Sequence, residues 1–178
     1  RRVLVLNGPN LSRLGSREPE IYGDLNLAEL ERLCREGGEA LGLDVDVRQT
    51  DHEAELVAWL HEAADGHYPV VLNPAAFTHY SYALRDAVAQ RTAPLIEVHL
   101  TNPAAREAFR HTSVVAGVAS GTIAGFGAAS YLLALQAIAR SDFNNFYSVR
   151  HYDVQQSNQR DREQTLSPLR ASRLAAPW

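Results

Sequence analysis

The chain has 178 residues, of which 46% are hydrophobic and 21% charged, the ordinary balance of a soluble globular protein. Its net charge of −4 gives no basic surface for nucleic acid or an anionic membrane, so we expect neither partner. No secretory signal is visible and no run is apolar enough to span a membrane, so we expect a cytoplasmic location. A single cysteine, Cys34, excludes an intrachain disulfide framework and a cysteine-cluster zinc site. All 17 basic residues are arginine, which excludes a lysine Schiff base and a P-loop lysine.

Strand-like and helix-like segments alternate along the first 140 residues. Short, β-branched apolar runs predict five strands, at residues 2–6, 43–47, 68–72, 94–100 and 114–118. Apolar residues at helical spacing predict helices after the caps Asn26 and Asp51, over 80–90, over 103–110 behind Asn102, and over 126–140. Five strand–helix units in succession predict an α/β fold, a doubly wound parallel sheet with helices on both faces.

Residues 141–178 have a different composition, rich in Asn, Gln, Ser and Arg with weak periodicity. We therefore expect a catalytic or binding domain over 1–140. The C-terminal extension over 141–178 is expected to be partly disordered or packed on a neighbouring subunit.

Chemically capable side chains follow several predicted strands. Asn10 follows the first strand, Asn73 and His79 the third, and Glu97 and His99 belong to the fourth. Ligands of open α/β sheets bind outside the carboxyl ends of the strands, so these side chains should meet at one edge. Glu97 and His99 are two residues apart and point to the same face, where a carboxylate can fix the tautomer of an imidazole. A purely structural pair is the alternative.

Two arginines suggest a ligand that carries a carboxylate or phosphate. Arg106 and Arg110 are four apart on the predicted helix that opens at Asn102, beside the amide groups of its first turn. The alternative is that both are solvated, and this suits Arg106 better than Arg110.

The first loop places Tyr22 five residues after Arg17. A tyrosine with its usual pKa of ~10 is a poor base at neutral pH unless nearby cations stabilise its phenolate. Arg17 could do so, and Arg13 is a second candidate. A packing role for this tyrosine is the alternative.

Several motifs in order resemble the type II 3-dehydroquinate dehydratase family. They are LNGPNL at 6–11, LG at 14–15, REPEIYG at 17–23, LNP at 72–74, TH at 78–79, ALRD at 83–86, IEVH at 96–99, RE and FR at 106–110, and the glycine-rich 121–127. The resemblance covers about residues 2 to 140. It implies a flavodoxin-like domain that removes water from 3-dehydroquinate to give 3-dehydroshikimate.

The resemblance also implies a role for each matching residue. Tyr22 would take the proton from the carbon next to the ketone, Arg17 would lower the pKa of Tyr22, and Asn10 would hold a water against the enolate oxygen. His99, oriented by Glu97, would protonate the departing hydroxyl in an anti elimination. The substrate-binding positions would be Asn73, His79, Leu100, Thr101, Arg110 and, reaching an adjacent subunit, Asp86.

The unrelated type I enzymes of this reaction form a lysine Schiff base, which a chain without lysine cannot make. Direct proton abstraction through an enolate remains, and it needs no metal or cofactor. The family implies a dodecamer built from trimers. Some positions depart from the commoner pattern. Ala75 stands where glycine is frequent and Thr101 where serine is frequent, and Ser12 and Arg13 replace the usual Asn-Leu, which adds a cation near the first loop.

The resemblance thus implies a hydro-lyase of the shikimate pathway, in aromatic amino acid biosynthesis. The same reaction in quinate catabolism is the alternative among enzymes. A non-catalytic, flavodoxin-like binding module is the alternative outside them.

Overall fold

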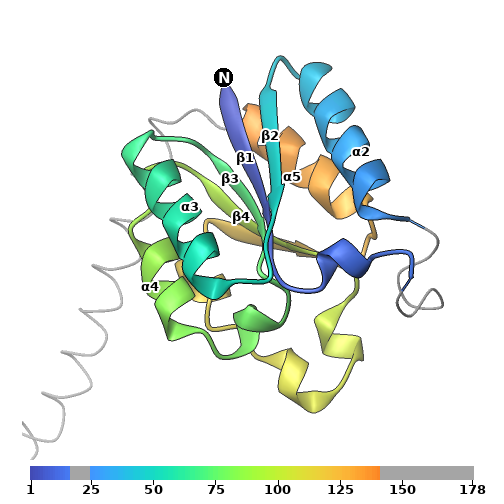
Figure 1. The fold of residues 1–178 in the computed structure, drawn as a ribbon, viewed down its shortest axis with the longest axis vertical. Helices are drawn as coiled ribbons and strands as arrows, with labels where there is room; N and C mark the ends of the chain where they lie inside the picture. Colours follow the sequence, from blue (N-terminus) through green and yellow to red (C-terminus); the bar gives the residue numbers. More distant parts are fainter. Residues whose placement is uncertain (17–24, 141–178) are drawn as a thin grey trace, which may run out of the picture. The chain divides into compact units, whose positions relative to one another are not determined.

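The computed structural model describes residues 1–16 and 25–140, and these form a five-stranded parallel sheet (Figure 1). The strands are β1 (Arg2–Asn7), β2 (Asp44–Gln49), β3 (Val70–Asn73), β4 (Leu95–His99) and β5 (Gly121–Ala124). Their order across the sheet is β2-β1-β3-β4-β5, and every neighbouring pair is parallel. This is the strand order of flavodoxin-like folds, so the predicted fold class is confirmed.

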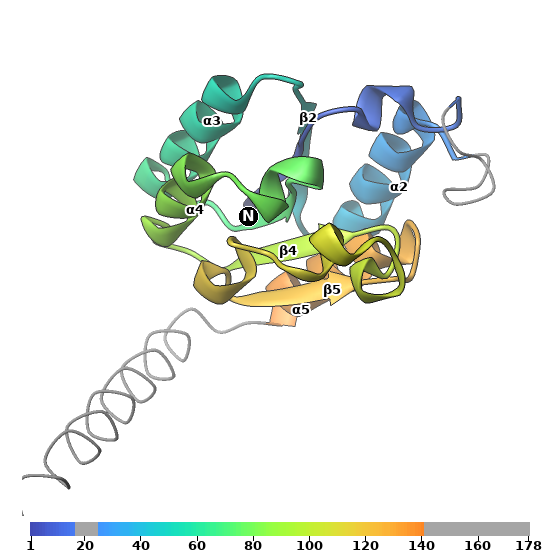
Figure 2. The same cartoon turned by 90° about the horizontal axis from the view of Figure 1, so that it is seen from below.

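Four α-helices cover the two faces of the sheet (Figure 2). They are α2 (Leu27–Glu39), α3 (Glu53–Asp65), α4 (Tyr82–Ala89) and α5 (Ala129–Arg140). Helix α2 packs beside α5 on one face, and α3 packs beside α4 on the other. Two apolar cores result, and the fully buried leucines in them each contribute about 1.5–3 kcal/mol to folding.

The start of α2 follows the sequence signal closely. Asn26 accepts a hydrogen bond from the amide of Glu29, and Glu29 accepts one from the amide of Asn26. This reciprocal capping box satisfies two amides that a helix start leaves without partners. The predicted cap of α3 is wrong, because its first turn follows His52 and Asp51 binds elsewhere.

The fifth strand lies further along the chain than predicted. Residues 114–118 contain the short 3-10 helix η5 (Ala116–Val118), and β5 begins only at Gly121. The apolar signal at 114–118 has another cause, since Val115 is fully buried in the core beneath α3 and α4. Strand β5 begins with a glycine and is at most partly buried, so it lacks the continuous apolar run that predicted the other strands.

The helix predicted over 103–110 is also wrong. Two 3-10 turns, η3 (Pro103–Ala105) and η4 (Ala108–His111), replace it, and Arg106 between them has extended backbone angles. Within the described ranges no helix is long and apolar enough to cross a membrane.

The strand order reverses between β1 and β3, where Asn7 and Asn73 are register partners at the carboxyl ends. The chain after β1 passes close to the chain after β3. A Cβ added at Gly8 would lie 2.7 Å from the carbonyl oxygen of Pro74, so this approach requires glycine. The 3-10 turns η1 (Leu11–Arg13) and η2 (Ala75–His79) follow these two strands and frame a cavity.

Candidate active site

A cavity of about 140 Å³ opens at the carboxyl edge of the sheet. Its walls come from the segments after β1, β3 and β4. The lining residues are Pro9, Asn10, Leu11, Arg13, Leu14, Asn73, Ala75, Ala76, His79, His99, Leu100, Thr101, Pro103, Arg106 and Arg110. This is the edge at which doubly wound sheets bind ligands.

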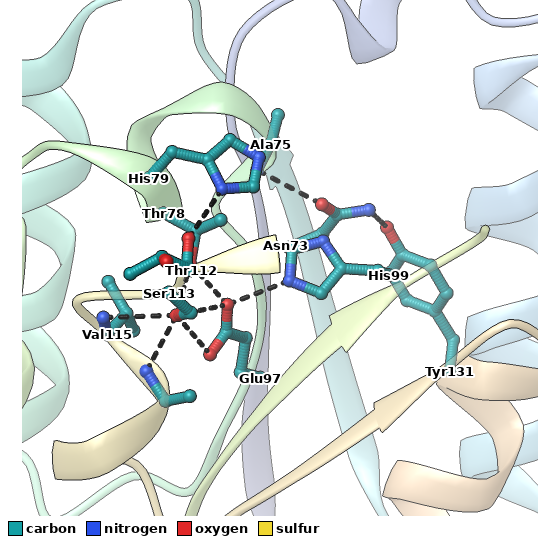
Figure 3. Close-up of polar contacts among 11 residues, drawn as sticks. Asn73, Ala75, Thr78, His79, Glu97, His99, Thr112, Ser113, Val115 and Tyr131 are labelled. Atoms are coloured by element: carbon teal, nitrogen blue, oxygen red, sulfur yellow. Dashed lines mark hydrogen bonds and ion pairs between the residues drawn. The ribbon is translucent and has the colours of Figure 1, made fainter. Parts of the chain in front are cut away.

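The imidazole of His99 contacts the carboxylate of Glu97 behind the cavity wall (Figure 3). Nε2 of His99 lies 2.8 Å from Oε1 of Glu97, as their spacing on β4 predicts. Glu97 is fully buried and His99 is 12% exposed, so the imidazole reaches the cavity and the carboxylate does not. The geometry suits an imidazole that exchanges a proton with a ligand while a buried anion holds its orientation.

Two hydroxyl groups bind the other side of Glu97. Thr78 donates to Oε1 of Glu97, and Ser113 lies 3.2 Å from both carboxylate oxygens. A buried carboxylate is costly unless such donors replace water, so these bonds explain how β4 tolerates a charge here.

A second polar network ties the ends of β1 and β3 to α5. Tyr131 donates to Oδ1 of Asn7 over 2.7 Å and accepts a hydrogen bond from Nδ2 of Asn73 over 2.8 Å. Burial raises the pKa of the Tyr131 hydroxyl far above its usual value, so it stays protonated. Oδ1 of Asn73 accepts from the amide of Ala75, which leaves this side chain fixed beside the cavity.

The turn after β3 carries backbone strain. Ala75 has a φ of +48°, a left-handed angle that favours glycine. Ala75 therefore holds this turn at a conformational cost that glycine would not carry. His79, at the end of this turn, hydrogen-bonds through Nδ1 to the carbonyl of Thr112 over 2.8 Å.

Three arginines line the cavity and make it positive. Arg13 comes from the first loop, and Arg106 and Arg110 come from the turns after β4. Glu107 lies between the last two, with Arg110 Nε 2.8 Å and Arg106 Nε 3.5 Å from its carboxylate. Its own backbone amide and the Arg110 guanidinium donate to that carboxylate, which lowers the pKa of Glu107. An anionic ligand fits this wall.

The first loop is anchored to the end of β2. Asn10 has a left-handed φ of +68°, and its amide donates to Asp51 over 2.8 Å. Gln49 donates to the same carboxylate oxygen over 3.0 Å. Asp51 therefore holds Asn10 at the cavity instead of capping α3.

The structure brings most of the predicted site residues together. Asn10, Asn73, His79, His99, Leu100, Thr101 and Arg110 line the cavity, and Glu97 supports His99. Asp86 is 71% exposed, binds Arg85 and is not among the lining residues. Arg17 and Tyr22 lie outside the described residues.

The structure does not support a solvated Arg106, and sequence patterns missed three residues that support the site. Arg106 is only 14% exposed and lines the cavity, because the extended backbone between η3 and η4 turns it inward. Ser113, Tyr131 and Asp51 support the site from segments far away in the sequence. No local pattern marks them.

In the part of the chain that the structure describes, no three His, Cys, Asp or Glu side chains cluster as metal ligands.

Comparisons with known proteins agree on one family. The family model described as dehydroquinase class II matches residues 1–139. A protein of Salinispora tropica named 3-dehydroquinate dehydratase is 60% identical over 138 residues, which are 78% of this chain and 96% of that protein. One of the same name from Thermus thermophilus is 53% identical over 140 residues, 78% of this chain and 94% of that one.

Solved structures agree as well. A type II dehydroquinase from Propionibacterium acnes superposes with a TM-score of 0.78 and 55% identity, covering 79% of this chain and 97% of that one. Another, from Butyrivibrio crossotus, has a TM-score of 0.75 and 40% identity, covering 77% of this chain and 96% of that one.

Proposed function

The chain belongs to the dehydroquinase class II family, and we propose that the cavity at its sheet edge is the active site of a 3-dehydroquinate dehydratase. This hydro-lyase converts 3-dehydroquinate into 3-dehydroshikimate and water. The observation that carries the proposal is the convergence of Asn10, Asn73 and His99 on one arginine-lined cavity.

The first step is removal of a proton from the carbon next to the ketone. Tyr22 is the base, and Arg17 stabilises its phenolate. The electron pair of the broken C–H bond becomes the enolate, whose oxygen is stabilised by a water that Asn10 holds. The absence of lysine in the chain supports direct abstraction over a Schiff base.

The second step is loss of the hydroxyl from the face opposite the removed proton. As the enolate collapses to the conjugated enone, the C–O bond breaks and His99 gives a proton to the leaving oxygen, which departs as water. The buried carboxylate of Glu97, 2.8 Å from Nε2 of His99, supports the cationic imidazole that this step consumes.

The carboxylate and the hydroxyl groups of the substrate bind the other residues that line the cavity. Asn73, His79 and Arg110, with the backbone of Leu100 and Thr101, hold the ring in place. The arginines compensate the charge of the substrate. The reaction requires no metal or cofactor.

The proposed assembly is a dodecamer built from trimers. We place the enzyme in the cytoplasm and its reaction in the shikimate pathway. Asp86 is exposed and lies outside the cavity of its own chain, which supports a role at the site of an adjacent subunit. Mixing inactive Tyr22→Phe subunits with inactive Asp86→Ala subunits should restore activity, because some mixed sites then carry both native residues. No recovery from a folded mixed assembly would contradict this role of Asp86.

The function itself is tested by a continuous ultraviolet assay with purified protein and 3-dehydroquinate. Absorbance of the conjugated enone should rise, survive a chelator, and nearly disappear in Tyr22→Phe. No rise from folded, assembled protein would reject the proposal in favour of a binding module. Near-normal turnover by Tyr22→Phe would remove Tyr22 as the base.

A further inference from the structure

The hydroxyl groups of Ser113 and Thr78 contact the buried carboxylate of Glu97, and the proposed reaction assigns them no role. We infer that Ser113, together with Thr78, is a positioning residue for the acid step: the two hydroxyls hold Glu97 as an acceptor, so that His99 keeps a hydrogen on Nε2 and uses Nδ1 toward the substrate. This inference rests on the proposed function for its kinetic part and on geometry alone for the state of the imidazole.

The backbone fixes the direction of the Ser113 hydroxyl. Its oxygen accepts hydrogen bonds from the amides of Val115, at 3.1 Å, and Ala116, at 2.8 Å. A hydroxyl has one hydrogen and two lone pairs, so with both lone pairs engaged the hydrogen must point elsewhere. Its remaining neighbours are Glu97, at 3.2 Å, and Thr78, at 2.7 Å.

Both possible directions lead to Glu97. Ser113 either donates to the carboxylate directly or donates to the oxygen of Thr78, whose own hydrogen goes to Oε1 of Glu97 (Figure 3). Oε1 of the fully buried Glu97 is therefore already an acceptor toward these hydroxyl groups. Nε2 of His99 is then the donor across its 2.8 Å contact with the same oxygen.

The state of the imidazole follows from this. In neutral His99 the hydrogen is on Nε2 and the lone pair is on Nδ1. Nδ1 is then the nitrogen that takes up a proton before the reaction and delivers it to the departing hydroxyl. Without Ser113, Glu97 loses a donor, the amides of Val115 and Ala116 lose their acceptor, and the carboxylate no longer imposes one tautomer.

Ser120 offers a matched control. Its hydroxyl oxygen also accepts a backbone amide, that of Leu95 at 2.9 Å, and it lies beside the same sheet. Among the described residues, its hydroxyl group hydrogen-bonds to Leu95 and Arg91 and not to Glu97 or His99. Ser120→Ala therefore removes a comparable serine without touching the proposed arrangement.

The first test is nitrogen NMR of the imidazole, which needs no turnover. We expect wild type and Ser120→Ala to show His99 protonated on Nε2 when neutral, and Ser113→Ala to show a mixture of the two tautomers. The His99 signal is identified by its loss in His99→Gln. An unchanged tautomer in folded Ser113→Ala would overturn the inference, and so would protonation on Nδ1 in wild type.

The second test compares two rates with 3-dehydroquinate: elimination, and exchange of the carbon-bound proton with solvent. Ser113→Ala should lower kcat about 10-fold, with KM within about twofold and exchange less affected than elimination. Ser113→Thr keeps the hydroxyl and should recover most of kcat. Equal loss of both rates, or the same loss in Ser120→Ala, would overturn the inference.

Thr78→Val is the second variant if Ser113→Ala does not fold, because it removes the other hydroxyl at nearly constant volume. It should show the same change of tautomer and the same selective loss of elimination, and normal behaviour would contradict the inference. If wild type itself shows no turnover, the proposed function fails, while the NMR result still decides the state of His99.

Discussion

The hydroxyl of Tyr131 donates to the side chain of Asn7 across 124 residues of sequence, over 2.7 Å. The same hydroxyl accepts a hydrogen bond from Asn73. One side chain of α5 thus joins the ends of the two strands between which the sheet order reverses. The position of Asn73 at the cavity depends on it.

Tyr131→Phe should destabilise the fold by about 1–3 kcal/mol, because Asn7 and Asn73 lose a buried partner that water cannot easily replace. It should also weaken substrate binding. Urea unfolding followed by circular dichroism measures the first effect, and KM reports the second. Tyr82→Phe is the control, since Tyr82 is 69% exposed. Equal midpoints for both variants would show that the network adds nothing.

The buried thiol of Cys34 should make the free energy of unfolding fall as the pH rises into the alkaline range. Burial raises its pKa from an ordinary 9.0 to about 12. The unfolded chain releases this proton first, so the thiol's contribution is complete below about pH 9 and is lost as pH rises toward 12. Between pH 9 and 10.5 the free energy of unfolding should fall by up to about 2 kcal/mol more in wild type than in Cys34→Ala. Parallel pH profiles would contradict the assignment.

Ala75→Gly should stabilise the chain by about 1 kcal/mol. Its φ of +48° costs an alanine more than a glycine, and this gain exceeds the entropy that glycine loses on folding. Ala76→Gly, in the same turn without a positive φ, should instead destabilise by about 0.5–1 kcal/mol. Denaturant midpoints decide, and a shift of the same sign in both variants would argue against strain at Ala75.

Arg106→Ala should raise KM for 3-dehydroquinate about tenfold or more, because a cation that lines the cavity is lost. Arg32→Ala is the control, because Arg32 is 61% exposed on α2 and its ion-pair partner among the described residues is Glu36. Initial rates over a range of substrate concentrations separate KM from kcat. A KM within twofold of wild type would place Arg106 outside the binding site.

Local patterns were sufficient for much of the fold and for one central contact. The apolar runs of β1 to β4 and the Asn26 cap are signals carried by neighbouring residues, and so is the spacing of Glu97 and His99. Strand β5 was misplaced because burial of Val115 comes from core packing rather than from strand pairing.

The supporting residues of the site could not be predicted in the same way. Ser113 is 16 residues from Glu97, and Asp51 is 41 residues from Asn10. A serine or an aspartate in a loop has many possible partners, and only the folded chain selects one. The inward turn of Arg106 likewise depends on a break between two short turns that helical spacing does not reveal.

The long reach of the Tyr131 bridge has a consequence for folding kinetics. Parallel strands with distant partners form slowly, because loop-closure entropy must be overcome before their contacts exist. The bond between Asn7 and Tyr131 joins residues 124 apart in the sequence, so its formation carries a large loop-closure cost. During refolding from urea, helical signal should therefore return before tyrosine burial, and the ability to bind substrate should return last.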